Sequence, residues 1–256
     1  MIYHETEHGV LYCGDCLEIL PTLEVKADMI LCDLPYGTTA CKWDVIIPFE
    51  PLWEQYKRII KDNGAIVLTA SQPFTSALVM SNVKDFRYNL IWNKHKSSSA
   101  LHAKIQPLRI HEDIVIFSKN KTVYNPQMVK GKPRVDKESK ISNGEAFGNN
   151  IVTRKYENKE GLYYPKSILD ISNADQTNKV HPTQKPVALF EYLIKTYTNE
   201  GDLVLDNCAG SGTTAIAAIR YNRRYIMIEK EEKYCEIAAK RIETELNQTD
   251  IFREAP

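Results

Sequence analysis

Short apolar runs alternate with amphipathic segments along most of this chain. The run at 65–70 is almost wholly apolar, which is typical of a strand covered on both faces of a parallel sheet. At 53–61 apolar residues recur at helical spacing and predict one buried helical face. The same reasoning predicts further strands at 10–13, 27–32, 87–92, 113–117, 203–205 and 224–229, and further helices at 17–20, 73–80, 186–198, 215–220 and 231–247. Alternating strands and helices predict an α/β fold with a doubly wound, mostly parallel sheet.

The pattern weakens between residues 120 and 178, where Gly, Asn and Pro are scattered among polar residues. A chain of 256 residues is long enough for one large domain that carries an insertion. We therefore expect residues 120–178 to form an inserted segment. Residues 1–119 and 179–256 would be the two halves of the surrounding domain.

Composition restricts the classes of protein that fit this pattern. Apolar residues make up 43% and charged residues 26%, as in globular proteins, and the formal net charge is zero. Without a net positive field, any nucleic-acid surface must come from local clusters of charge. No apolar run approaches the roughly 20 residues that span a bilayer, and the N-terminal residues lack the basic start and apolar core of a signal peptide. We therefore expect a cytoplasmic protein without membrane contact, whose six cysteines are reduced.

The strand expected at 27–32 ends abruptly at Asp33-Leu34-Pro35-Tyr36. Proline cannot continue a central strand, so the chain must leave the sheet here. A carboxylate, a backbone carbonyl and a flat ring would then lie together at the rim of the sheet. Such acceptors beside a stacking face suit a planar ligand that carries an amino group, such as a nucleobase. An ordinary turn after a strand is the alternative.

A second turn of interest is Asp206-Asn207-Cys208-Ala209-Gly210-Ser211-Gly212-Thr213-Thr214, between an expected strand and a helix. The glycines allow the backbone to approach a ligand closely, and the hydroxyls lie where a helix N-terminus would hold a carboxylate or phosphate. Glu229 ends the next expected strand, where an acid binds ribose hydroxyls in nucleotide-binding α/β folds. The glycine spacing fits neither the dinucleotide fingerprint nor the P-loop. A turn that only packs helix on strand is the alternative.

Two shorter segments complete the candidate chemistry. His181-Pro182-Thr183-Gln184-Lys185-Pro186 directly precedes the helix expected at 186–198, and its lysine offers a cation. Taken alone, a loop stiffened by prolines is the commoner explanation for this segment. Asp15 is placed to cap the helix at 17–20. Cys13 and Cys16 lack a second Cys or His pair at ligand spacing, so we predict no metal site.

Basic residues gather in two segments. Residues 93–111 carry a local charge of +4 with no acid, and residues 119–140 carry seven Lys or Arg against two acids. Solvated loops are the ordinary explanation. The alternative explanation is that these two basic segments contact a polyanion.

The three motifs occur in the order Asp-Leu-Pro-Tyr, His-Pro-Thr-Gln-Lys-Pro, Asp-x-x-x-Gly-Ser-Gly-Thr-Thr. In this order they resemble the β-class amino-group DNA methyltransferases, which use S-adenosylmethionine. The resemblance implies a Rossmann-like methyltransferase fold, with a catalytic half at 1–119, a target-recognition insert at 120–178 and a cofactor-binding half at 179–256. Leu34 departs from the usual proline, and Asn207 and Cys208 depart from the usual Pro-Phe.

The resemblance also implies roles for single residues. In the motif Asp33, Leu34, Pro35 and Tyr36, the carboxylate and the Leu34 carbonyl would accept the amino hydrogens of a flipped base, and the tyrosine would stack on it. The expected cofactor contacts are Asp206, Cys208, Gly210, Ser211 and Gly212 for the methionine part, Thr213, Thr214 and Lys185 for its carboxylate, Glu229 for the ribose, and Asp15 with Cys16 for the adenine. Phosphate contacts are expected from Lys94, Lys96, Lys104, Lys130, Lys132 and Arg134.

Several functions remain open at this stage. Asp33 at the first motif position favours adenine N6 as the target in duplex DNA, and cytosine N4 is the alternative within the family. Methylation of an RNA base or a protein amide is a second alternative, and a catalytically silent DNA-binding subunit is a third. A nucleotide-binding oxidoreductase is disfavoured by the glycine spacing. A homodimer and a cognate restriction endonuclease are further partners that the resemblance leaves open.

Overall fold

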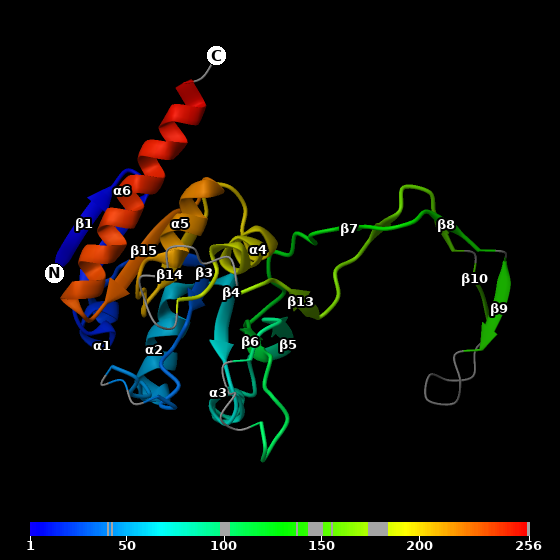
Figure 1. The fold of residues 1–256 in the computed structure, drawn as a ribbon, viewed down its shortest axis with the longest axis horizontal. Coiled ribbons are helices and arrows are strands. Elements are labelled where there is room, and N and C mark those ends of the chain that lie inside the picture. The colour runs from blue at the N-terminus through cyan, green and yellow to red at the C-terminus, as the bar shows by residue number, and fades with distance from the viewer. Residues whose placement is uncertain are drawn as a thin grey trace. The chain divides into compact units, whose positions relative to one another are not determined.

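The structure, a computed structural model, describes residues 1–254 except 40, 42, 98–102, 137, 143–150, 155 and 174–183. The chain forms two compact units, one of them Pro126–Lys166 and the other built from the residues before and after it. The larger unit contains a nine-stranded sheet (Figure 1). Within the described residues, no helix is both long and apolar enough to cross a membrane.

The sheet has the order β1-β2-β15-β14-β3-β4-β6-β5-β13. Its members are β1 (Ile2–Thr6), β2 (Gly9–Cys13), β3 (Ala27–Cys32), β4 (Ile60–Ala70), β5 (Phe86–Asn93), β6 (His111–Phe117), β13 (Ile168–Asp170), β14 (Leu203–Asp206) and β15 (Arg224–Glu229). Neighbours from β2 to β4 are parallel, whereas β6 runs antiparallel between β4 and β5. The prediction of a doubly wound, mostly parallel sheet is therefore confirmed.

Helices cover both faces of this sheet. One face carries α1 (Cys16–Ile19), α2 (Phe49–Ile59) and α3 (Phe74–Ser81), and the other carries α4 (Val187–Tyr197), α5 (Thr213–Arg220) and α6 (Glu232–Glu254). Successive residues of β3 point to opposite faces, so Met29 and Leu31 pack with the second group while Ile30 and Cys32 pack with the first. Each large apolar side chain buried this way contributes about 1.5–3 kcal/mol.

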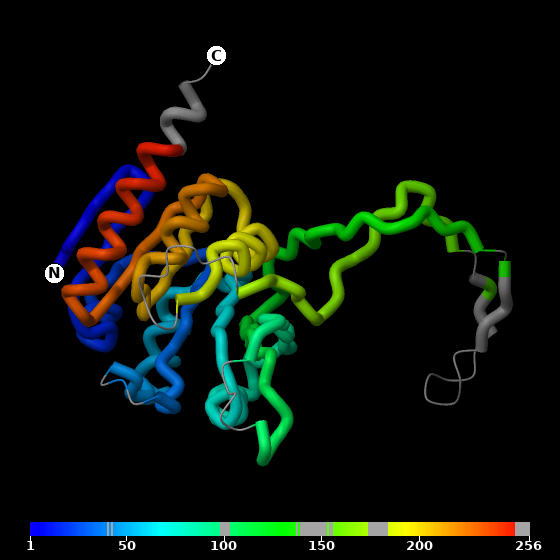
Figure 2. Tube along the Cα trace, in the orientation of Figure 1, coloured from blue at the N-terminus to red at the C-terminus, as the bar shows by residue number. Residues whose placement is uncertain are grey.

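The N-terminal hairpin contains one strand, β1, that the sequence pattern did not predict, whereas its other strand, β2, was expected at 10–13. β1 pairs antiparallel with β2, and β2 pairs in parallel with β15. In Figure 2 this blue hairpin lies beside the red helix α6. β1 is an edge strand whose residues are mostly exposed, so its sequence lacks the apolar run that revealed the central strands.

Two boundaries differ from those expected. Residues 60 and 61 were expected to end the helix at 53–61, and the next strand was expected only from residue 65, yet β4 begins at Ile60, because Ile60 pairs with Ala27 of β3. The insert expected at 120–178 is narrower as a compact unit, because β13 pairs in parallel with β5 in the main sheet. The smaller unit is an antiparallel ribbon of nested strand pairs: β7 (Val129–Lys130) with β12 (Leu162–Tyr163), β8 (Arg134–Val135) with β11 (Glu157–Asn158), and β9 (Ser139–Ser142) with β10 (Ile151–Arg154).

Candidate active site

A cavity of about 730 Å³ opens at the carboxyl edge of the sheet. Its lining includes residues 14–17 after β2, 33–36 after β3, 206–211 at the end of β14 and 229–231 at the end of β15. These strands are consecutive neighbours in the sheet. Parallel α/β sheets bind ligands at this edge, because the loops after the strands converge there.

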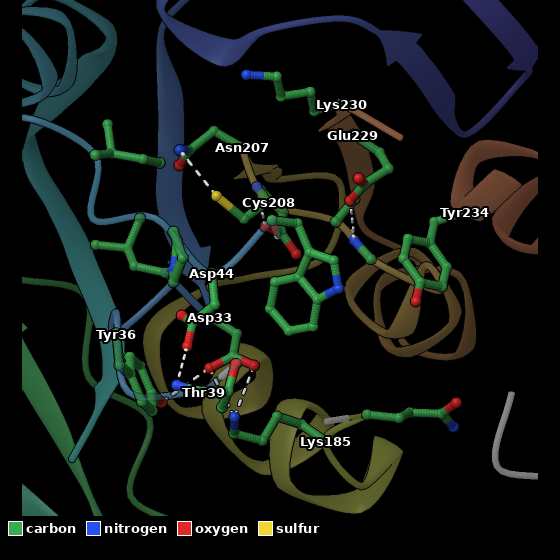
Figure 3. Close-up of a pocket in the computed structure, with 18 of the residues that line it drawn as sticks. Asp33, Tyr36, Thr39, Asp44, Lys185, Asn207, Cys208, Glu229, Lys230 and Tyr234 are labelled. Atoms are coloured by element: carbon green, nitrogen blue, oxygen red, sulfur yellow. Dashed lines mark hydrogen bonds and ion pairs between the residues drawn. The ribbon is translucent and has the colours of Figure 1, made fainter. Parts of the chain in front are cut away.

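The carboxylate of Asp33 is the centre of one side of the cavity (Figure 3). The ammonium of Lys185 donates to both of its oxygens, at 2.7 Å from Oδ1 and 2.6 Å from Oδ2. The hydroxyl of Tyr36 donates to Oδ1 at 2.9 Å, and the hydroxyl of Thr69 donates to the same atom. Sequence reasoning missed Thr69, although it is the one polar residue within the apolar stretch of β4.

Lys185 lies elsewhere than the resemblance implies. It was expected to bind the carboxylate of the cofactor, whereas its buried ammonium is held by Asp33 and lies 3.4 Å from Glu112 Oε2. Burial lowers the pKa of Lys185, but the carboxylates of Asp33 and Glu112 outweigh burial and leave this pKa above its ordinary value. The lysine is therefore a charged partner of the carboxylate at the end of β3.

Lys94 also differs from expectation. It was expected on the DNA phosphates, yet its side chain is buried and donates to Glu112 Oε1 at 2.8 Å. Burial raises the pKa of Glu112, and the nearby ammonium groups of Lys185 and Lys94 more than offset this, so the pKa lies below its ordinary value. Lys94 is thus a structural counter-ion at the site and is not available at the surface. Sequence reasoning did not select Glu112 as a site residue.

The ring of Tyr36 stacks on Phe74 with centroids 5.3 Å apart and an angle of 26° between the planes. The Lys185 ammonium lies 5.4 Å from the centroid of the same ring. Burial raises the pKa of Tyr36 well above its ordinary value, so the phenol remains protonated. Leu34 is buried in the core, which leaves its backbone carbonyl as the group with polar chemistry.

The loop that follows Tyr36 is organised by Asp44, which sequence reasoning did not select. The buried carboxylate accepts hydrogen bonds from the backbone N–H groups of Gly37, Thr38 and Thr39 at 2.7–2.9 Å. Trp43 and residues 45–48 of the same loop line the cavity. Asp44 therefore ties together the loop that borders the cavity beside Tyr36.

The turn after β14 forms the other side of the cavity. Asp206 is buried, and it accepts hydrogen bonds from the hydroxyl of Thr214 and from the backbone N–H of Cys208, the latter at 3.0 Å. Burial raises the pKa of Asp206 to about 6, although these hydrogen bonds oppose the shift. Gly210 and Gly212 have φ of +52° and +81°, which favour glycine. The turn thus enters α5 in a conformation that few other residues adopt.

Acids at the ends of β15 and β2 complete the lining. Glu229 Oε2 accepts from the Gly210 N–H at 2.7 Å, so the end of β15 is tied to the glycine turn (Figure 3). Burial raises the pKa of Glu229. Asp15 caps α1 through the N–H of Leu17 at 2.9 Å, as predicted, and its other oxygen pairs with Lys230 at 3.0 Å.

Most of the residues selected from sequence therefore line one cavity. They are Asp15, Cys16, Asp33, Leu34, Pro35, Tyr36, Lys94, Lys185, Asp206, Cys208, Gly210, Ser211, Thr213, Thr214 and Glu229. Gly212 instead packs against α6, because a Cβ there would lie 3.0 Å from that of Ala238. Lys96 and Lys104 are exposed, as are Lys130, Lys132 and Arg134 on the ribbon. Residues 181–183 of the Pro-bounded motif lie outside the described residues.

The fold and the cavity define a doubly wound α/β protein with a ligand-sized cavity at the carboxyl ends of its parallel strands. Residues 27–240 match the N6_N4_Mtase family, described as DNA methylase. The chain therefore belongs to this family of amino-group DNA methyltransferases, as the resemblance of its motifs implied.

Similar proteins cover nearly the whole chain. The type II methyltransferase M.HpaI of Haemophilus parainfluenzae is 28% identical, over 95% of this chain and 77% of that one. M.HinfI of Haemophilus influenzae is 28% identical, over 93% and 69%. The structure of M1.HpyAVI with S-adenosylmethionine has a TM-score of 0.61 at 25% identity, and covers 90% of this chain and 98% of that one. The cytosine-N4-specific PvuII DNA methyltransferase shares the fold, with a TM-score of 0.61 at 17% identity over 95% and 93% of the two chains.

Proposed function

We propose that this protein transfers a methyl group from S-adenosylmethionine to the N6 amino group of adenine at a specific sequence in duplex DNA. One observation carries the proposal. Asp33 directly follows β3, and residues 206–211 of the glycine turn lie at the end of β14. The two strands pair directly in the sheet, and both segments line the same cavity. The carboxylate of Asp33, which can accept hydrogen bonds from an amino group, thus lies next to the turn that would bind the methyl donor.

The residues at the glycine turn fit the cofactor. A Cβ added to Gly210 would meet no described atom within 4 Å, so this stretch of backbone borders open space in the cavity. The carboxylate of Glu229 lies against the same turn, where it would bind the ribose hydroxyls of the cofactor. Asp15 lines the cavity just after β2, where it would face the adenine ring. Bound there, S-adenosylmethionine supplies a methyl group on a positively charged sulfur, with a neutral thioether as the leaving group.

The residues after β3 suit the target amino group. An amino group conjugated with its ring is a poor nucleophile, and the base must leave the duplex to reach a recessed site. Asp33 and the Leu34 carbonyl would accept its two hydrogens, which would draw the nitrogen toward a tetrahedral geometry and free its lone pair. The Tyr36 ring offers a stacking face. Positioning and fixed charges would carry most of the reduction of the barrier.

The preference for adenine over cytosine depends on Asp33. An aspartate at the first position of the motif supports adenine N6, and the alternative is cytosine N4. The likeness to the cytosine-N4-specific PvuII enzyme extends to the fold alone at 17% identity, so it does not favour the alternative. The type II relatives support a partner endonuclease with the same recognition sequence.

The antiparallel ribbon of the smaller unit is the proposed target-recognition segment. Its Lys130, Lys132 and Arg134 are exposed, and Arg134 pairs with Asp136 at 2.7 Å. Lys96 and Lys104 are exposed on the larger unit. We assign the contacts with DNA phosphates to these exposed residues. Lys94 is not one of them, because its side chain is buried and paired with Glu112. Such contacts release counter-ions, so the affinity for DNA would fall with salt.

Sequencing of methylated bases in DNA from cells that express the protein tests the proposal. We expect N6-methyladenine at one short recurring sequence. The Asp33→Ala variant should leave no mark, whereas Asp62→Ala should keep it, because Asp62 is exposed and pairs with Lys119 on the surface. Methyl marks on cytosine N4 would change the base assignment. A mark that persists in Asp33→Ala would refute the role of Asp33.

A further inference from the structure

The two carboxylate oxygens of Asp33 accept different numbers of hydrogen bonds. Oδ1 accepts from Tyr36, Thr69 and Lys185. Among the described residues, Oδ2 accepts from Lys185 alone, at 2.6 Å. Since each carboxylate oxygen has two lone pairs, the target amino group must approach Oδ2, beside the ammonium or in its place. A hydrogen bond from an ammonium is stronger than one from a neutral amine, so the ammonium competes with the target base.

The carboxylate of Glu112 provides a second binding position for the Lys185 ammonium. Its Oε2 is buried and receives no hydrogen bond from the described residues, and the Lys185 ammonium lies 3.4 Å away. A buried acceptor without a donor is costly and uncommon. A shift of the ammonium by about 0.5 Å would bring it within hydrogen-bond distance of Oε2. The other oxygen of Glu112 is held by Lys94, which fixes the carboxylate in place.

The four charges form an alternating row of Lys94, Glu112, Lys185 and Asp33, with side chains 9%, 15%, 8% and 23% exposed. The row has no net charge. Moving the ammonium toward Glu112 therefore keeps each buried carboxylate beside a cation, and avoids the cost of an isolated buried charge.

We propose that Lys185 is a mobile counter-ion that rests on Asp33 and moves to Glu112 Oε2 when the target amino group enters. Glu112 is then a positioning residue, which acts on the reaction through Lys185. The inference rests on the proposed function, because it needs an amino group that binds Asp33. It accounts for the ammonium that bridges both oxygens of a carboxylate assigned to the substrate.

Glu112→Gln tests the inference, because glutamine keeps the shape of the side chain but loses the charge that attracts the ammonium. We expect the turnover rate on DNA carrying the recognition sequence to fall about 10- to 100-fold, as for a lost charged hydrogen bond. The dissociation constant for S-adenosylmethionine, measured by calorimetry, should stay within about twofold. Glu236→Gln is the matched control, because it removes an exposed carboxylate paired with Lys240 on α6, and its rate should equal that of the wild type.

The double variant Lys185→Met/Glu112→Gln separates this role from a structural one. It removes the ammonium that competes for Asp33 together with the Glu112 carboxylate that would receive it. We therefore expect its turnover rate to exceed that of Glu112→Gln by about tenfold. A Glu112→Gln enzyme with the wild-type rate would overturn the inference. So would a double variant as slow as Glu112→Gln, since Glu112 would then act only on the fold. If the wild-type protein methylates no DNA, the proposed function fails instead.

Discussion

Gly210 and Gly212 allow a direct test of where the cofactor binds. Both have positive φ, +52° and +81°, which costs a residue with a side chain about 1–2 kcal/mol. Their surroundings differ. A Cβ at Gly210 would point into open space in the cavity, whereas a Cβ at Gly212 would lie 3.0 Å from that of Ala238 on α6. Alanine at the two positions therefore separates the cost to folding from the cost to ligand binding.

The expected magnitudes follow from these environments. In Gly210→Ala the backbone strain should lower the melting temperature by about 2–8 °C. The added methyl group should clash with the methionine part of the cofactor, which costs about 1–3 kcal/mol and raises the dissociation constant about 5- to 150-fold. Gly212→Ala bears the same strain and also the contact with Ala238, so it should be at least as destabilised. Its dissociation constant should stay within about twofold of the wild type.

Calorimetric titration with S-adenosylmethionine and thermal melts of the ligand-free proteins provide both quantities. The temperature of the titration must lie below the melting transition of each variant, so that only folded protein is compared. A folded Gly210→Ala protein with wild-type affinity would refute the assignment of this turn to the cofactor. Equal loss of affinity in the two variants would also refute it, because the effect would then come from the fold.

Two further predictions concern the buried acids around the cavity. The folded protein holds the proton of Asp206 up to a pKa of about 6, against an ordinary value of 3.8, so it binds more protons than the unfolded chain between these values. Stability should therefore fall as pH rises from about 4 to 6, by at most about 3 kcal/mol relative to Asp206→Asn, as measured by denaturant unfolding of both proteins. Asp44→Ala leaves the N–H groups of Gly37, Thr38 and Thr39 without their acceptor and should cost about 1–3 kcal/mol in the same assay. An unchanged unfolding free energy would show that water replaces the carboxylate.

The elements and motifs predicted from the sequence share one property, which is that short stretches encode them. The apolar runs of β3, β14 and β15 need no partner to be recognised, because a strand buried on both faces is apolar throughout. Pro35 and the glycine turn mark strand ends through their own backbone preferences. The site was predicted because parallel strands that end in such turns must present them at the same edge of a sheet.

What the sequence pattern could not provide depends on contacts between distant segments. Lys185 and Asp33 are separated by 152 positions, and nothing near either residue indicates that they form an ion pair. Lys94 belongs to a basic segment, so its composition favoured the surface, whereas pairing with Glu112 makes its burial tolerable. Asp44 is the local exception, because it accepts from N–H groups only five to seven residues earlier, in a loop whose sequence has no periodic pattern to indicate these contacts.

The pairing of β3 with β14 has a consequence for how such enzymes are assembled. Met29 and Ile30 lie opposite Val204 and Leu205, and this neighbourhood alone brings Asp33 to the glycine turn. This arrangement does not depend on which of the two strands comes first in the sequence. A gene that encoded β14 and β15 ahead of β3 and β4 would build the same edge. The linear order of the motifs can therefore be rearranged in the gene while the chemistry is kept.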